Sequence, residues 1–253
     1  MRVIALADIH FKKGYDGKLS SLVDTIGEAD ALLLAGDLTH FGNESELDTV
    51  LNIVSRISKQ IMAVPGNCDT TEIARLLKER GVSLESTAKI ADSIAVQGLG
   101  GVPQWRKVDY GFTESQLAEF LQQGRAELDS LSAVSKPTAK ILLTHVPPYY
   151  SQADRVMFMR HVGSKSLGEY IKENSFNLCV CGHIHECVGK SLFENTPLVN
   201  CGPARRGYYA EIIIQTNGAE DVADSPNNPA ITVGGNGALI SAEIKRDSSR
   251  FWG

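Results

Sequence analysis

Short apolar runs alternate with amphipathic stretches of helical length along most of this 253-residue chain. The runs at residues 3–7, 31–35 and 61–64 are apolar throughout, which is typical of strands buried on both faces of a mostly parallel sheet. This order of segments predicts an α/β fold. Because no repeat, low-complexity tract or linker interrupts the pattern, we expect residues 1–253 to form one domain.

The same patterns predict the individual elements. Strands are expected at residues 3–7, 31–35, 61–64, 93–97, 141–144, 178–181, 198–200, 208–214 and 238–244. Helices are expected at residues 18–28, 44–59, 71–80, 113–131 and 166–173. The last strands follow one another without helices between them, so we expect them to be antiparallel, with the Gly/Asn/Asp/Pro-rich residues 215–237 as a surface loop.

Composition narrows the class of protein. The chain is 43% hydrophobic and 22% charged, as expected for a globular protein with a full core. Its net charge of −5 disfavours a dedicated nucleic-acid binder, although a nucleic acid stays among the conceivable substrates. No apolar run is long enough for a membrane span or a signal peptide. With five cysteines, an odd number, we expect a reduced, cytoplasmic protein without a disulfide framework. No feature of the sequence specifies an oligomeric state.

Five of the expected strands run directly into side chains that bind metals. In open α/β sheets, ligands bind beyond the carboxyl ends of the strands, so these side chains should meet at one edge. The candidate metal ligands are Asp8, His10, Asp37, Asn67, His145, His183 and His185. Seven groups are too many for one tetrahedral zinc site, but they fit two ions that share a carboxylate.

The donor set indicates the ions and the kind of substrate. Nitrogen and oxygen donors without a thiolate suit Mn²⁺, Fe, Zn²⁺ or Ni²⁺; the ligand types do not select one, and we favour manganese. Two divalent ions beside two carboxylates leave an excess of positive charge. That excess suits a small, anionic phosphate ester as substrate, with no membrane partner.

The motifs resemble those of the calcineurin-like metallophosphoesterases, and among them the small prokaryotic phosphodiesterase-like members. The resemblance rests on five motifs in order, namely Asp-x-His at 8–10, Gly-Asp at 36–37, Gly-Asn at 66–67, the single His145 and Gly-His-x-His at 182–185. It implies a four-layer α/β/β/α sandwich of two mixed sheets flanked by helices. It also implies a ligand set in which Asp8, His10 and His185 bind one ion, Asn67, His145 and His183 bind the other, and Asp37 bridges them.

The resemblance implies hydrolysis of phosphate esters by a hydroxide that bridges the ions, with Asn67 and His145 near the phosphoryl oxygens. Many relatives carry histidine after Gly-Asn, where this chain has Cys68, and a thiol is a poor general acid. His40 is the first candidate replacement and His161 the second, although either could instead be a surface or supporting residue. The departure at Cys68 favours phosphodiesters as substrates. The alternatives are a phosphomonoesterase or protein phosphatase, and a catalytically silent scaffold on the same fold.

Other polar residues have competing interpretations. Cys179, Cys181 and Cys187 match no common zinc spacing, so packing is the preferred role for them. The pair at 205–206, both arginines, could contact a phosphate, but a solvated pair is slightly preferred. Asp69 is a candidate partner that fixes the tautomers of His10 and His185. Residues 147–163 are a candidate wall of the substrate pocket, whereas Trp105 and Tyr110 are expected to pack within a loop.

Overall fold

The computed structural model describes residues 1–104, 108–156, 160–216, 233–235 and 238–247. Trp105 and residues 217–232 of the expected surface loop therefore lie outside the described residues, as do residues 157–159 of the expected pocket wall. Tyr110 is buried against Phe112, as expected for loop packing.

The first sheet has six strands in the order β15-β16-β14-β1-β2-β3. Strands β1 to β3 are parallel, with β3 at the edge of the sheet, and each is followed by a helix on the same face. Antiparallel β14 pairs with β1, and β16 extends the sheet beyond it. The strands are β1 (Arg2–Leu6), β2 (Ala31–Ala35), β3 (Ile61–Val64), β14 (Tyr208–Thr216), β15 (Val233–Gly235) and β16 (Ala238–Arg246).

The second sheet also has six strands, in the order β12-β13-β11-β8-β5-β4. Its four central strands are parallel, and its two edge strands are antiparallel to their neighbours. The strands are β4 (Ala88–Ala91), β5 (Ile94–Leu99), β8 (Ala139–Thr144), β11 (Leu178–Cys181), β12 (Gly189–Phe193) and β13 (Thr196–Asn200). The expectation of antiparallel late strands is thus right for β14 and β16 but wrong for β13. The hairpin partner β12 takes the edge, which leaves β13 parallel to β11.

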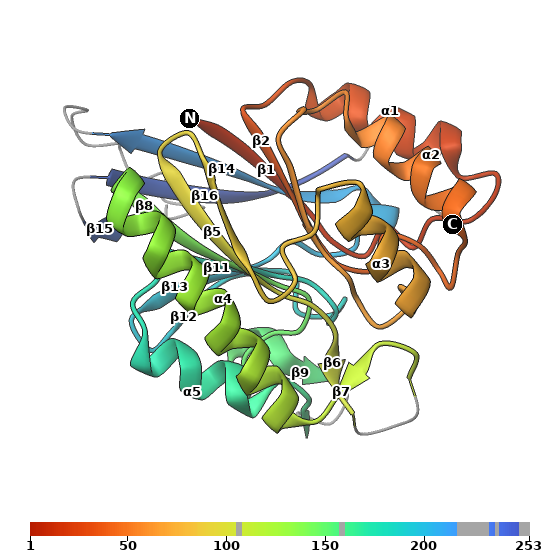
Figure 1. The fold of residues 1–253 in the computed structure, drawn as a ribbon. Coiled ribbons are helices and arrows are strands. Elements are labelled where there is room, and N and C mark those ends of the chain that lie inside the picture. The colour runs from red at the N-terminus through yellow and green to blue at the C-terminus, as the bar shows by residue number, and fades with distance from the viewer. Residues whose placement is uncertain (105–107, 157–159, 217–232, 236–237, 248–253) are drawn as a thin grey trace.

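The two sheets and their helices form four layers (Figure 1). Helices α1 to α3 cover the outer face of the first sheet, and α4 and α5 cover that of the second. The expected α/β/β/α sandwich is therefore confirmed. Side-chain caps begin four of these helices, supplied by Asn43, Thr70, Thr113 and Ser164. The helices are α1 (Asp16–Ile26), α2 (Glu44–Val54), α3 (Thr71–Glu79), α4 (Glu114–Ser135) and α5 (Lys165–Glu173).

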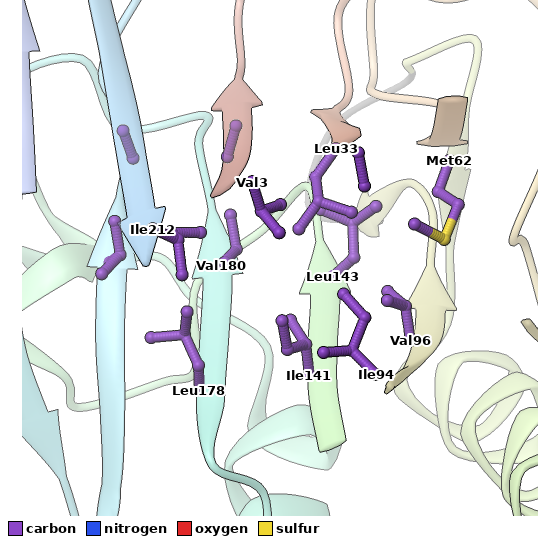
Figure 2. Packing of buried hydrophobic residues seen from close by; sticks show 14 of the residues in the cluster. Val3, Leu33, Met62, Ile94, Val96, Ile141, Leu143, Leu178, Val180 and Ile212 are labelled. Atoms are coloured by element: carbon purple, nitrogen blue, oxygen red, sulfur yellow. The ribbon is translucent and has the colours of Figure 1, made fainter. Parts of the chain in front are cut away.

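The core lies in three apolar layers. The middle layer fills the space between the sheets, where Val3, Leu33 and Met62 of the first sheet face Leu143 and Val180 of the second (Figure 2). Two outer layers join each sheet to its helices. Because the strands are apolar on both faces, each sheet contributes to two of these layers, as the continuous apolar runs predict.

Short elements depart from the sequence expectations. The edge strands β4 and β12 are less apolar than the central ones, and the pairs β6 (Val102–Pro103) with β7 (Gly111–Phe112) and β9 (Arg155–Val156) with β10 (Arg160–His161) are too short to show a period. Helix α2 ends five residues earlier than expected. In the described part of the chain, no helix combines the length and the apolar character that crossing a membrane requires.

Candidate metal centre

The loops that leave the parallel strands carry their polar side chains on unusual backbone. Asp8, His10, Asp37 and His183 all have positive φ, between 45° and 67°. Such left-handed conformations are unfavourable for residues other than glycine and concentrate at functional sites. The strand ends are therefore held in turns that direct these side chains toward one another rather than along the strands.

Glycines allow the loops to approach each other. A Cβ on Gly36 would overlap the ring of His145, and a Cβ on Gly66 would overlap the carboxylate of Asp37. The Gly-Asp and Gly-Asn motifs thus require glycine because other ligand-bearing residues pack directly against its backbone.

One group of candidate ligands surrounds Asp8. Its Oδ1 lies 3.3 Å from His185 Nε2 and 3.9 Å from His10 Nε2. Its other oxygen, Oδ2, accepts a hydrogen bond from the backbone N–H of His183 at 3.0 Å. Asp8 Oδ1 and His10 Nε2 are both buried and make no hydrogen bond within the described part of the chain. Two such atoms side by side fit a bound cation, since buried polar atoms are otherwise almost always paired.

A second group surrounds His145, which is fully buried. Its Nε2 lies 3.1 Å from Asn67 Oδ1 and 3.6 Å from Asp37 Oδ1, and its ring packs edge-on against His183. Its Nδ1 lies 2.9 Å from the carbonyl oxygen of Ala35, to which it donates. That bond keeps a proton on Nδ1, so Nε2 is the ring atom available to a metal, the arrangement usual for a metal-binding histidine. Burial opposes a positive charge on this ring, but the nearby carboxylates of Asp37 and Asp8 outweigh it and raise the pKa of His145.

Asp37 connects the two groups. Its Oδ1 is the atom near His145, and its Oδ2 lies 3.5 Å from His10 Nε2. Ligand atoms of Asp8, Asp37 and His145 lie within 4.8 Å of one another, as do those of Asp8, His10 and His185. The structure therefore brings all seven sequence-predicted ligands to one edge between the sheets, with Asp37 in the middle.

Burial sets the protonation states around these ligands. It lowers the pKa of His10 and of His183 to about 3, so both imidazoles are neutral near pH 7, as metal ligation requires. Burial, reinforced by the nearby carboxylates of Asp69 and Asp8, raises the pKa of Asp37 to about 7. A carboxylate so destabilised in its charged form gains from a nearby cation. The donor set thus fits two divalent ions.

Asp69 has a different role from the expected one. Its carboxylate accepts hydrogen bonds from the backbone N–H groups of Leu38, Thr39 and Gly66, at 2.9–3.1 Å, and from the Thr39 hydroxyl. Within the described residues, Asp69 makes no hydrogen bond with His10 or His185. The expectation that it fixes their tautomers is therefore wrong. It ties the Gly-Asp loop to the Gly-Asn loop.

His40 lies at the rim of the centre. Its Nδ1 faces His10 Nδ1 at 3.5 Å, and its ring atoms approach Cys68 Sγ. Burial, followed by the positive charges of Lys12 and Arg205, lowers the pKa of His40. Cys68 is buried, and burial raises the pKa of its thiol, so this sulfur keeps its proton.

His161 lies on β10 and belongs to a different group of residues. Its Nδ1 is 2.6 Å from Oδ1 of the fully buried Asp154. The other carboxylate oxygen accepts from the backbone N–H groups of Tyr150 and Gly163, which holds Asp154 rigidly. His161 lines a cavity of about 770 Å³, whose walls also include Gln104, Arg160 and Gly163.

None of the seven candidate ligands is among the wall residues of this cavity, but chain segments next to its walls are hydrogen-bonded to three ligand-bearing loops. Gly101 donates its N–H to the carbonyl of Pro65, directly before Gly66 and Asn67. Ser164 donates to the carbonyl of Pro147, two residues after His145. The Cys187 thiol, two residues after His185, donates to the carbonyl of Arg155, the β-pairing partner of His161.

The cysteines of β11 and the two arginines at 205–206 differ in how well they match the expectations. Cys179 and Cys181 are buried in β11 and form no described metal-binding group with Cys187, in keeping with packing. Arg206 is exposed, whereas Arg205 is half-buried with its Nη2 3.2 Å from His185 Nδ1. The solvated-pair expectation is thus wrong for Arg205.

Sequence reasoning missed Asp154 and misjudged Arg205. Asp154 pairs with His161, seven residues later, across the short hairpin of β9 and β10. Strands of two residues show no periodicity, so the sequence does not predict this hairpin. The signal for Arg205 is its place after Gly202 and Pro203, at the end of β13, because the ends of parallel strands gather at the site.

Comparison with known proteins adds family information. A family model described as calcineurin-like phosphoesterase matches residues 1–187. An uncharacterized protein of Methanocaldococcus jannaschii, MJ1162, is 31% identical over 220 residues, which cover 83% of this chain and 90% of that protein.

Two solved structures share the fold. TT1561 of Thermus thermophilus superposes with a TM-score of 0.59 at 19% identity, over 83% of this chain and 92% of that one. A putative 5'-nucleotidase of Staphylococcus aureus superposes with a TM-score of 0.58 at 13% identity, over 98% of this chain and 55% of that one.

Proposed function

This chain belongs to the calcineurin-like phosphoesterases, and we propose that it is a dinuclear-metal-dependent hydrolase of small phosphate esters, with a preference for diesters. The observation that carries the proposal is the pair of buried, unpartnered ligand atoms, Asp8 Oδ1 and His10 Nε2, within a set of seven potential ligands. We propose manganese as the native ion and the cytoplasm as the setting, which the five free cysteines support.

The proposed ligands divide between two ions. Asp8, His10 and His185 would hold one ion, Asn67, His145 and His183 the other, and Asp37 both. Bound there, two divalent ions would supply an activated water and neutralise charge that builds on the phosphoryl group. His145 and Asn67 lie beside each other and would also orient the non-bridging oxygens.

His40 is proposed to act beside His10. If His10 presents its Nε2 lone pair to an ion, its proton is on Nδ1 and is donated to His40 Nδ1. The proton of His40 then lies on Nε2, from which it can hydrogen-bond a phosphoryl oxygen. With Nδ1 committed as an acceptor, His40 is poorly suited to carry the extra proton of a general acid.

His161 is the residue that we propose as proton donor to the leaving group. The buried carboxylate of Asp154 orients the ring through Nδ1, which leaves Nε2 as the atom for proton transfer. The adjoining cavity gives the leaving group room. This pairing would compensate for Cys68, and diesters of poor leaving groups would need it.

Two substrates that differ in their leaving group test whether His161 is the general acid. With Mn²⁺ present, His161→Gln is expected to lower kcat on an alkyl glycerophosphodiester by roughly 10²-fold and to change kcat on bis(p-nitrophenyl) phosphate little, since p-nitrophenolate departs without protonation. Asp154→Asn should show the same selectivity. Equal losses on both substrates would contradict a general-acid role.

Two further measurements distinguish the alternative functions. Faster hydrolysis of p-nitrophenyl phosphate than of bis(p-nitrophenyl) phosphate would favour a phosphomonoesterase or protein phosphatase. A scaffold without catalysis would bind no ion by metal analysis and hydrolyse neither ester after Mn²⁺ is added.

A further inference from the structure

Arg205 is placed by backbone contacts with the first strand end. Pro203 forms a β-bridge with Ala7, and Ala204 donates its N–H to the carbonyl of Ala7 at 2.8 Å. The N–H of Arg205 lies 3.4 Å from the carbonyl oxygen of Asp8. The arginine therefore stands next to a candidate ligand in space, although the two are far apart in sequence.

The guanidinium of Arg205 is only partly satisfied. Its Nη2 donates to His185 Nδ1, while its Nε is buried and has no hydrogen-bond partner within the ranges that the structure describes. In those same ranges, no carboxylate lies within ion-pair distance of it. An arginine has five N–H donors in a planar fork that matches carboxylate or phosphate oxygens. Arg205 therefore has donors left with which to bind an anion.

A permanent cation beside two metal sites is unfavourable unless an anion lies between the charges. We propose that Arg205 binds a non-bridging oxygen of the substrate phosphoryl group, on the side of the ion held by Asp8, His10 and His185. The proposal rests on the proposed function and adds to it a phosphate-binding residue from the region after residue 187.

Hydrogen-bond chemistry couples this role to metal binding. Arginine can only donate, so Nδ1 of His185 must be an acceptor in this structure, and a neutral His185 carries its proton on Nε2. Nε2 is the atom that lies 3.3 Å from Asp8 Oδ1, without the alignment of a hydrogen bond. Ligation through Nε2 would need the lone pair there and would place the proton on Nδ1. Arg205 would then lose its acceptor on His185 and be free to bind phosphate.

The coupling makes two opposite predictions for one variant. Arg205→Ala should bind inorganic phosphate roughly tenfold more weakly in the Mn²⁺-loaded protein, since a charge-assisted hydrogen bond is lost. The same variant should bind Mn²⁺ more tightly, by a few-fold, because a competing hydrogen bond and a like charge are removed. Arg205→Lys, which keeps the charge but not the fork, should fall between wild type and Arg205→Ala for phosphate.

Isothermal titration of Mn²⁺, and then of inorganic phosphate, measures both affinities without any catalytic step. Arg206→Ala is the matched control, because it removes the same charge from the exposed neighbour. Long-range ¹H–¹⁵N spectra of the metal-free protein should also show an unprotonated Nδ1 in His185.

Three results would overturn the proposal. They are unchanged phosphate affinity in Arg205→Ala, an equal loss in Arg206→Ala, and a parallel loss of Mn²⁺ and phosphate binding in Arg205→Ala, which would indicate a structural role. Absence of hydrolysis by the wild type would instead refute the proposed function, and the phosphate titration would still decide the role of Arg205.

Discussion

At the scale of the residue, the site combines strained backbone with buried charge. Each non-glycine residue in the left-handed region costs on the order of 1 kcal/mol, and four candidate ligands share that conformation. Asp69 offsets part of this cost by accepting three backbone N–H groups from the two loops that carry Asp37 and Asn67. The ligand positions are thus preorganised by hydrogen bonds that exist before any ion binds.

Asp37 is the residue on which the dinuclear proposal depends most. Asp37→Asn keeps the shape and the acceptor for the Cys68 N–H, but it removes the charge that would be shared between two ions. Because burial of that carboxylate is unfavourable without a cation, the metal-free variant should be at least as stable as the metal-free wild type. Manganese occupancy, measured by metal analysis, and hydrolysis should fall together.

Asp24→Asn is the control for this substitution, since it makes the same chemical change on an exposed carboxylate of α1. An unaltered rate with full metal occupancy in Asp37→Asn would refute the bridging assignment.

At the scale of the element, the parallel strands and their helices follow from the sequence, whereas the antiparallel edge strands β4, β12 and β15 do not. Residues 31–35 are apolar on both faces and form a strand with the expected bounds, because burial on both sides requires that composition. The edge strand β12 contains Lys190 and Ser191 and gains its pairing from a hairpin with β13, which no local pattern reveals. The seven ligands were predictable because strand ends define their position, whereas the Asp154–His161 pair depends on the fold of a loop.

Glu114 joins two helices at their N-termini. It lies in the first turn of α4, and its carboxylate accepts from the backbone N–H groups of Lys165 and Ser166 and from the hydroxyl of Ser164. These groups begin α5, which follows strand β10 with His161. Burial opposes ionisation of Glu114, but the donated hydrogen bonds outweigh it and lower the pKa.

Glu114→Gln should therefore lower the free energy of unfolding by about 1–2 kcal/mol at pH 7, as measured by urea denaturation. A carboxyl group whose pKa is lowered by folding contributes stability above its unfolded pKa of about 4.3, and that contribution is lost as the pH falls through the folded pKa. The difference between variant and wild type should accordingly shrink at low pH. The exposed Glu119→Gln on the same helix should show no difference at either pH, and a pH-independent effect of Glu114→Gln would exclude this linkage.

At the scale of the whole molecule, the candidate centre lies where the two sheets meet. Asp8, Asp37 and Asn67 follow strands of the first sheet, whereas His145, His183 and His185 follow strands of the second. Away from this edge the sheets are joined by apolar contacts such as those of Leu33 and Leu143 (Figure 2). Bound ions would thus add polar cross-links between layers that otherwise adhere by hydrophobic packing. That one domain spans residues 1–253 stays a prediction.

Metal binding should consequently stabilise the whole sandwich rather than a single loop. Ions that bind the folded state alone add about 2.7 kcal/mol at a free concentration of 100 times Kd, which for a chain of this size corresponds to a rise in Tm of roughly 5–10 °C. Calorimetry of EDTA-treated protein with and without Mn²⁺ measures this shift. Hydrogen exchange should slow in both sheets, at the ends of β2 and β8 alike. Slowing confined to one sheet, or an unchanged Tm at saturating Mn²⁺, would contradict a centre that links the two.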